Sequence, residues 1–220
     1  MGLTMVLGLL SGYLIGSIPF GWVVVKIFTG KDVRGVESGR TGGTNAMRAA
    51  GPWAGLFTAV FDTLKGAAAV WIARALAPAE ALSAPLSGLM AILGHNYSLF
   101  LLEKGENGKL RLRGGAGGAT TLGAAMGLWL PSLFVILPLV ATVYVVVGYA
   151  SITTISIAFT SLALFALRAQ MGLNPWDYAL LGAGALVIVI IALRPNLQRL
   201  IAGTERKVNI LARLKRKPRS

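Results

Sequence analysis

Long apolar runs separated by short polar segments dominate this chain of 220 residues. Seven runs are visible, covering residues 3–28, 53–76, 82–102, 117–130, 132–147, 151–167 and 176–193. A helix needs roughly 20 residues to cross about 30 Å of hydrocarbon, so the fourth and fifth runs are short for a span. Pro131 and Pro138 also interrupt that region. The pattern predicts an all-α integral membrane protein with about seven transmembrane helices.

The composition supports this class. Hydrophobic residues make up 55% of the chain, and a soluble domain of this length is expected to be more polar. We expect the first run to be retained as a span, because it has no basic start and is longer than the apolar part of a signal peptide. With no cysteine, one histidine and eight acidic residues, the chain excludes disulfides and thiolate metal sites, and we expect no metal site.

The net charge of +13 comes from cations at the ends of the apolar runs. If the N-terminus lies outside, all lysines and arginines except Lys65, Arg74 and Arg168 fall on the cytoplasmic side or in the C-terminal tail. This asymmetry predicts a plasma-membrane protein with an outside N-terminus and a cytoplasmic C-terminus. Anionic membrane lipid, and not nucleic acid, is the expected partner of these cations. We divide the chain into a transmembrane domain, residues 1–205, and a basic cytoplasmic tail, residues 206–220.

The segment from Glu37 to Arg48 is rich in glycine, hydroxyl groups and positive charge. Amides exposed by glycine, the hydroxyls of Ser38 and Thr44, the amide of Asn45 and the guanidinium of Arg48 together suit a phosphate. The segment lies where the chain leaves the membrane and re-enters it. This placement indicates chemistry on a phosphorylated lipid precursor.

A second glycine-rich segment follows Arg111 and Arg113, with four glycines between residues 114 and 118. It precedes an apolar run, so a phosphate could lie at the N-terminus of the next helix. Small residues also allow membrane helices to pack closely, which is the alternative interpretation. The two arginines favour the anion site. We expect both glycine-rich loops to be cytoplasmic.

Asp62, Lys65 and His95 are ionisable residues in the second and third apolar runs. His95 is a lone histidine, and such residues are usually hydrogen-bonded parts of the structure. Asp62 and Lys65 are three positions apart and can pair on one face of a helix. We favour a structural pair that faces the bundle, with a proton-relay or substrate role as the alternative, because charges inside a membrane are costly unless paired or functional.

These motifs together resemble those of the bacterial acyl-phosphate-dependent glycerol-3-phosphate acyltransferase family, a group of small seven-span membrane enzymes. The resemblance covers nearly the whole chain in the right order. It rests on Gly16-Ser-Ile-Pro-Phe-Gly21, the loop Ser38–Arg48, Asp62-Thr-Leu-Lys-Gly66, Leu93-Gly-His95, the glycine loop Gly114–Thr120, Tyr149-Ala-Ser151, Asn196-Leu-Gln-Arg-Leu and Gly203-Thr-Glu205.

The resemblance implies transfer of an acyl group from acyl phosphate to the 1-hydroxyl of glycerol 3-phosphate, giving lysophosphatidic acid in phospholipid synthesis. It implies no cofactor, and it implies that the phosphate of the donor acts as the base. Catalytic roles fall on Ser38, Arg48 and Asn196. Substrate-binding roles fall on a larger set at the same face, namely Arg40, Thr44, Asn45, His95, Arg113, Gly114, Gly115, Gly117 and Ser151.

Three positions depart from the family pattern. Ala116 replaces a lysine, Arg40 replaces an asparagine and Leu193 replaces a histidine, and extra residues are present around 103–111. The lost lysine and the gained arginine suggest that a cation has moved. Two other readings are altered acceptor specificity and a catalytically degenerate paralogue that binds lipid or phosphate. A transporter of a phosphorylated small molecule is less favoured, because the charges cluster at one face of the membrane.

Overall fold

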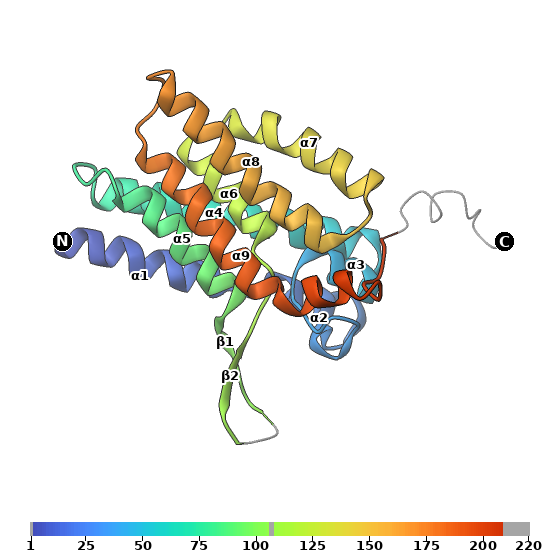
Figure 1. The fold of residues 1–220 in the computed structure, drawn as a ribbon. Helices are drawn as coiled ribbons and strands as arrows, with labels where there is room; N and C mark the ends of the chain where they lie inside the picture. The colour runs from blue at the N-terminus through green and yellow to red at the C-terminus, as the bar shows by residue number, and fades with distance from the viewer. Residues whose placement is uncertain (1, 106–107, 209–220) are drawn as a thin grey trace.

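The chain folds into a bundle of helices with one β-hairpin at its side (Figure 1). The computed structural model describes residues 2–105 and 108–208, so residues 209–220 of the predicted basic tail lie outside the described part. The helices within it are α1 Leu3–Ser17, α2 Phe20–Thr29, α3 Gly43–Ala50, α4 Pro52–Leu76, α5 Ser83–Asn96, α6 Gly118–Leu128, α7 Ser132–Val146, α8 Ala150–Gln170 and α9 Asp177–Ile201. A short 3₁₀ helix, η1 Val33–Gly35, and two strands, β1 Ser98–Lys104 and β2 Leu110–Arg113, complete it.

Every apolar run of the sequence forms a helix, which confirms a mostly helical protein. Among the described residues, four segments are long and apolar enough to cross a membrane, namely Leu3–Thr29, Pro52–Leu76, Ala150–Gln170 and Asp177–Ile201. Helix α7 is also apolar, but with 15 residues it is shorter than these four segments. Helices α5 and α6 have 14 and 11 residues, which is less than the roughly 20 residues expected of a full span.

The mostly helical fold includes one short β-hairpin, which begins at the end of the third apolar run. Helix α5 ends at Asn96, and β1 then pairs with β2 in an antiparallel hairpin that places Leu102 opposite Leu112. Residues 110–113 alternate between apolar and charged side chains, which favours a half-buried strand. The apolar residues 99–102 continue the hydrophobic run and conceal this boundary.

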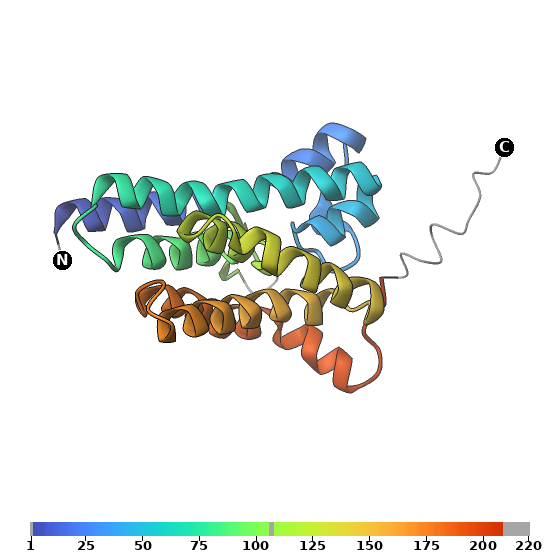
Figure 2. The ribbon, with the colours of Figure 1, turned by 90° about the horizontal axis from the view of Figure 1, so that it is seen from above.

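Small residues allow the helices to pack with their backbones in contact. A Cβ atom built on Gly16 of α1 would lie 2.2 Å from the carbonyl oxygen of Ala91 in α5. A Cβ atom built on Gly123 of α6 would lie 1.8 Å from the carbonyl oxygen of Thr63 in α4. Seen from above, α1, α4 and α5 lie on one side and α8 and α9 on the other, with α6 between them (Figure 2). Membrane helices commonly associate through small residues in this way.

The two ends of the bundle differ in charge. The α2–α3 connection, the start of α8 and the end of α9 lie together at one end, which we call the basic end (residues 30–51, 147–151 and 199–208) (Figures 1 and 2). The start of α1 and the α4–α5 and α8–α9 connections lie at the other end, close to Arg74 and Arg168. The two glycine-rich loops predicted to share one face contact each other, since the backbone N–H of Thr41 donates to the carbonyl oxygen of Gly114 at 3.2 Å.

Candidate active site

A pocket of about 940 Å³ lies among α3, α4, α6, α7, α8 and α9. Its apolar wall comes from α4, α6 and α7 and includes Leu56, Val60, Leu122, Leu133 and Leu137. Its polar wall comes from the basic end and contains most of the predicted site residues, namely Ser38, Arg40, Thr44, Asn45, Arg48, Ser151 and Asn196, with His95 and Gly117 nearby. A polar wall beside an apolar one fits an amphiphile that carries an anionic head and an acyl chain.

The first loop is held in shape by Asn45. Its side-chain Nδ2 donates to the carbonyl oxygens of Val33 at 3.2 Å, Val36 at 3.0 Å and Arg40 at 2.8 Å. Its Oδ1 is buried and has no hydrogen-bond partner among the described residues. The nitrogen of Asn45 therefore serves the loop, and only the oxygen is available to a ligand. Asn45 therefore shapes the loop through its nitrogen, and a substrate contact through its oxygen stays a prediction.

Ser38, Thr44 and Arg48 are placed by the same loop. Thr44 and Arg48 lie one helical turn apart on α3, so they share a face of that helix, and both line the pocket. The Oγ atom of Ser38 accepts a hydrogen bond from the backbone N–H of Arg40 at 3.4 Å. Two hydroxyls and a guanidinium are thus gathered on one wall, as an anion site requires.

Arg40 connects three distant parts of the chain. Its guanidinium donates to the carbonyl oxygens of Gly115, at 2.8 Å, and of Ala192, and it lies 3.4 Å from Oδ1 of Asn196. Burial, and then the positive charge of Arg199, lower the pKa of Arg40 from its ordinary value. Gly115 and Ala192 directly precede positions 116 and 193 in the chain. The three departures from the family pattern therefore meet at one place in the fold.

The glycines of the second loop serve different purposes. The backbone N–H of Gly115 donates to the carbonyl oxygen of His95 at 2.8 Å, and a Cβ atom on Gly115 would lie 2.0 Å from Nε2 of His95. A Cβ atom on Gly114 would lie 2.2 Å from the same carbonyl oxygen. Close packing therefore accounts for Gly114 and Gly115, neither of which lines the pocket. Gly117, with φ of +90°, forms the left-handed turn that begins α6, and it does line the pocket.

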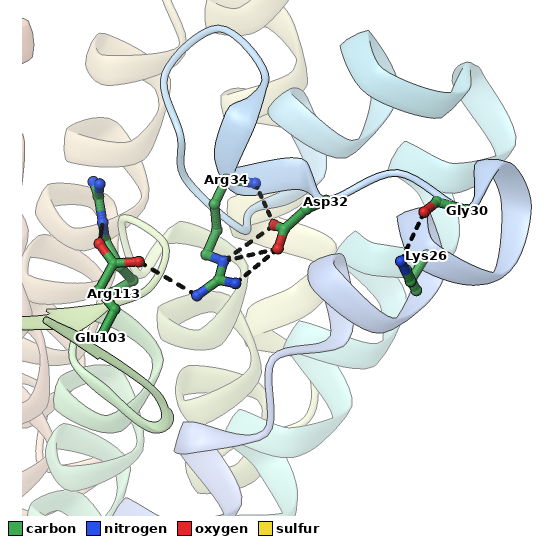
Figure 3. A network of polar contacts seen from close by, with 6 residues as sticks. All are labelled: Lys26, Gly30, Asp32, Arg34, Glu103 and Arg113. Atoms are coloured by element: carbon green, nitrogen blue, oxygen red, sulfur yellow. Dashed lines mark hydrogen bonds and ion pairs between the residues drawn. The ribbon is translucent and has the colours of Figure 1, made fainter.

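Arg113 takes part in an ion-pair network outside the pocket. Its Nε donates to Glu103, which also pairs with Arg34 at 3.4 Å, and Arg34 in turn pairs with Asp32 at 2.7 Å (Figure 3). Arg113 does not line the pocket. The structure thus places Arg113 outside the pocket, in an ion-pair network that joins the β-hairpin to η1.

Asp62, Lys65 and His95 form a buried cluster beside the pocket. Nζ of Lys65 lies 2.7 Å from Oδ1 of Asp62, and Nδ1 of His95 lies 3.5 Å from the same oxygen. Lys65 also donates to the carbonyl oxygen of Ile18 at 2.7 Å, where the first span bends. The pairing of Asp62 with Lys65 is confirmed. Asp62 and His95 both line the pocket. The ion pair of Asp62 with Lys65 therefore also supports the imidazole of His95 beneath the glycine loop.

Glu205 is a residue of this site that the sequence reasoning did not select. Its carboxylate accepts a hydrogen bond from Ser151 at 2.8 Å and another from Asn196 at 3.1 Å. The following Arg206 pairs with Glu37 of the first loop. Glu205 is the only acidic residue after Asp177, and this isolated acid in a basic segment was the signal available in the sequence. Residues 205 and 206 thus tie α8, α9 and the first loop together.

Comparison with known proteins decides the family. The model of the glycerol-3-phosphate acyltransferase family matches residues 6–203. This chain belongs to that family. Glycerol-3-phosphate acyltransferase 2 of Moorella thermoacetica is 37% identical over 204 residues, which cover 92% of this chain and 96% of the relative. The glycerol-3-phosphate acyltransferase of Thermus thermophilus is 38% identical over 206 residues, covering 91% and 93% respectively.

Solved structures of the family agree with this fold. The crystal structure of PlsY, an integral membrane glycerol 3-phosphate acyltransferase, in its glycerol 3-phosphate form matches with a TM-score of 0.79 and 27% sequence identity. The match covers 96% of this chain and 99% of the PlsY chain. A second structure of PlsY, in the lysophosphatidic acid form, matches with a TM-score of 0.77. The chain is therefore an integral, multi-pass membrane protein of the acyltransferase family.

Proposed function

We propose that this protein transfers an acyl group from acyl phosphate to the 1-hydroxyl of glycerol 3-phosphate and releases lysophosphatidic acid and phosphate. The observation that carries the proposal is the pocket, whose polar wall gathers Ser38, Thr44, Arg48 and Asn196 beside an apolar wall from α4, α6 and α7. Its relative PlsY has structures in a glycerol 3-phosphate form and a lysophosphatidic acid form, and these molecules are the acceptor and the product of this reaction.

The transfer needs no nucleophile from the protein. The acceptor oxygen forms a bond to the carbonyl carbon of the donor, and the bond between that carbon and the phosphate oxygen breaks. The proton of the hydroxyl passes to the departing phosphate, so charge and atoms balance. The protein then has two tasks, which are to position two anionic substrates and to stabilise the developing negative charge. One well-placed donor typically contributes about 3 kcal/mol to such stabilisation.

We assign the phosphate-binding tasks to the first loop and α3. Arg48 offers a planar guanidinium that holds phosphate through two hydrogen bonds, and the hydroxyls of Ser38 and Thr44 complete that side. The start of α6 at Gly117 presents backbone N–H groups to the second phosphate. Arg40 contributes positive charge to the site, while its hydrogen bonds to Gly115 and Ala192 fix the walls.

Asn196 and Ser151 complete the other side of the pocket. Glu205 accepts from both side chains and so fixes their orientation. The Nδ2 atom of Asn196 is turned toward Glu205, which leaves its Oδ1, near Arg40, to orient the acceptor. The acyl chain of the donor lies along the apolar wall between α4 and α7.

We infer that the basic end faces the cytoplasm of a plasma membrane, with the N-terminus outside. The distribution of lysine and arginine supports this orientation. The acceptor is a water-soluble metabolite of the cytoplasm. In this orientation the polar wall of the pocket opens toward the compartment that supplies it. Residues 1–205 form the catalytic membrane domain in this proposal, and the many cations from 206 onward favour a membrane that contains anionic lipid.

The direct test is turnover by purified protein in detergent or vesicles. Palmitoyl phosphate and labelled glycerol 3-phosphate are supplied, and we expect lysophosphatidic acid and phosphate in equal amounts. Arg48→Ala provides the matched inactive control. Release of phosphate without lysophosphatidic acid would contradict the assigned acceptor.

The degenerate-paralogue reading makes a different prediction for the same sample. The convergence of Arg40, position 116 and position 193 is the observation that favours it, because Arg40 donates to the carbonyl oxygens of the residues just before both positions. Such a protein would bind glycerol 3-phosphate in a calorimetric titration without forming product. Membership of the acyltransferase family favours the enzyme over both this reading and the transporter.

A further inference from the structure

The β1–β2 hairpin has two unlike faces. Glu103 lies opposite Arg111 in the strand register, and Arg113 follows two residues later on the same face. This charged face turns toward the first loop, where Glu103 pairs with Arg34 (Figure 3). These ion pairs fix the hairpin in one orientation relative to the bundle.

The opposite face is largely apolar and exposed, with Lys104 as its one charged residue among the paired positions. Leu102 lies opposite Leu112, and Leu110 lies opposite Lys104. Leu102 is 48% exposed and Leu110 67%, and Phe100, which lies at the register shift before Leu102, is 58% exposed. Large apolar side chains gathered on one exposed face of a two-stranded hairpin indicate a partner for that face.

The hairpin leaves the bundle at a defined depth. The hydroxyl of Ser98, at the start of β1, donates to the carbonyl oxygen of Ser17, the last residue of α1. Helix α1 has 15 residues and is therefore about 22 Å long at 1.5 Å per residue, so in a hydrocarbon core of about 30 Å its end lies about 8 Å from the far boundary. Interfacial elements bury their apolar face to about this depth. From there the hairpin projects sideways from the bundle (Figure 1). It thus runs along the membrane and not through it.

The backbone of the hairpin restricts the layer of the membrane in which it can lie. A two-stranded hairpin has two open edges, and their unpaired N–H and C=O groups are not tolerated against lipid tails. They are tolerated in the head-group layer, where water and polar groups satisfy them. An element with one apolar face and one charged face is stable at that boundary.

We propose that the hairpin is an interfacial anchor that binds a leaflet containing anionic lipid. Phe100, Leu102 and Leu110 enter the boundary between head groups and acyl chains, and Lys104 and Lys109 bind the negative head groups. Residues 103–113 carry four basic and two acidic side chains, so the net charge of the segment complements such a leaflet. This surface is separate from the pocket and does not depend on the proposed reaction.

The absence of cysteine from the sequence permits a clean test by spin labelling of the full chain in vesicles. Single variants Leu102→Cys and Leu110→Cys place labels on the apolar face, and Arg111→Cys places the matched control on the charged face. In vesicles of phosphatidylglycerol and phosphatidylcholine, we expect the two apolar-face labels to be severalfold more accessible to oxygen, relative to a water-soluble nickel complex, than the label at 111. Equal accessibility to the nickel complex at all three positions would overturn the proposal.

Two further outcomes are decisive. Labels at 102 and 110 that are shielded from both reagents and show spin–spin coupling would mean that a second copy of the chain covers this face.

In the background of Leu110→Cys, the double change Lys104→Gln and Lys109→Gln should move the label toward water, while Lys31→Gln, in the loop after α2, should not. No movement on the double change would overturn the role assigned to the anionic head groups.

Discussion

Arg40 is both a structural connection and a charge in the pocket, and these two roles predict a coupled result. Arg40→Asn removes donors from the carbonyl oxygens of Gly115 and Ala192, and a buried polar group without its partner costs about 1–3 kcal/mol. We expect lower thermal stability and an affinity for glycerol 3-phosphate that is at least tenfold weaker. Adding Ala116→Lys should restore much of the affinity, because the new ammonium lies beside the vacated position.

A full factorial of these two changes, measured by acceptor affinity and by thermal unfolding, tests that expectation. Ala116→Lys in the unmodified protein should give little benefit, since two neighbouring cations repel each other. If the effects of the two changes are simply additive, the residues do not share an anion. Arg40 would then be a structural residue only.

Substitutions of Arg48 test whether phosphate is recognised by the shape of the guanidinium or by its charge alone. A guanidinium binds phosphate through two parallel hydrogen bonds, and the ammonium of lysine does not reproduce this geometry. We expect Arg48→Lys to lose nearly as much kcat/KM as Arg48→Ala, on the order of 100-fold for about 3 kcal/mol. Steady-state kinetics with both substrates decide the question. Turnover by Arg48→Lys at the wild-type rate would reduce Arg48 to a cation that sets membrane topology.

At the scale of elements, the contact between α4 and α6 depends on a missing side chain. A Cβ atom at position 123 would lie 1.8 Å from the carbonyl oxygen of Thr63, so the two helices must move apart to admit it. Gly123→Ala should lower the free energy of unfolding by about 1–3 kcal/mol, as overpacking usually does. Gly35→Ala is the matched control, because its Cβ would meet nothing within 4 Å. Equal unfolding transitions for the two variants would contradict the close approach.

The first loop and the hairpin are joined by an ion-pair network that responds to pH. Hydrogen bonding from Arg34 holds the pKa of the Asp32 carboxyl well below its usual range. A carboxyl with a lowered folded pKa stabilises the fold above its unfolded pKa of about 4, and this stability is lost as the pH falls toward the folded value. Asp32→Asn should therefore lower the melting temperature at pH 7, and the deficit should shrink below about pH 4. A deficit that is independent of pH would assign the effect to packing.

Elements were predictable from the sequence wherever a single physical signal dominated. The apolar runs predicted the helices, because each run is long compared with any turn. The boundary at Asn96 was not predictable, because the strand residues 99–102 are as apolar as the helix before them. The loop from Ser38 to Arg48 was found by composition, whereas the contacts of Arg40 with residues 115 and 192 depend on chain segments far apart in sequence. Glu205 was missed for the same reason, since its partners Ser151 and Asn196 are brought to it only by the fold.

At the scale of the whole molecule, the charge asymmetry between the two ends predicts the orientation in the membrane. The basic end should lie in the cytoplasm, because short loops rich in lysine and arginine are retained there. A reporter that works only in the cytoplasm should be active when fused after residue 220 and inactive when fused before residue 1. A reporter that works only outside the cytoplasm should show the reverse. A C-terminal reporter that is active only outside the cytoplasm would reverse the orientation and place the polar wall of the pocket on the wrong side for its acceptor.

The connection of the first loop to the end of α9 has a consequence for how the protein is made. Arg40 donates to Ala192, Glu37 pairs with Arg206, and Glu205 orients Ser151, so the polar wall is complete only when residues near 205 have joined it. A chain still emerging from the ribosome, with its early helices already inserted, lacks this wall. The polar wall therefore forms only after the segment near residue 205 has been made and has packed against α8 and the first loop.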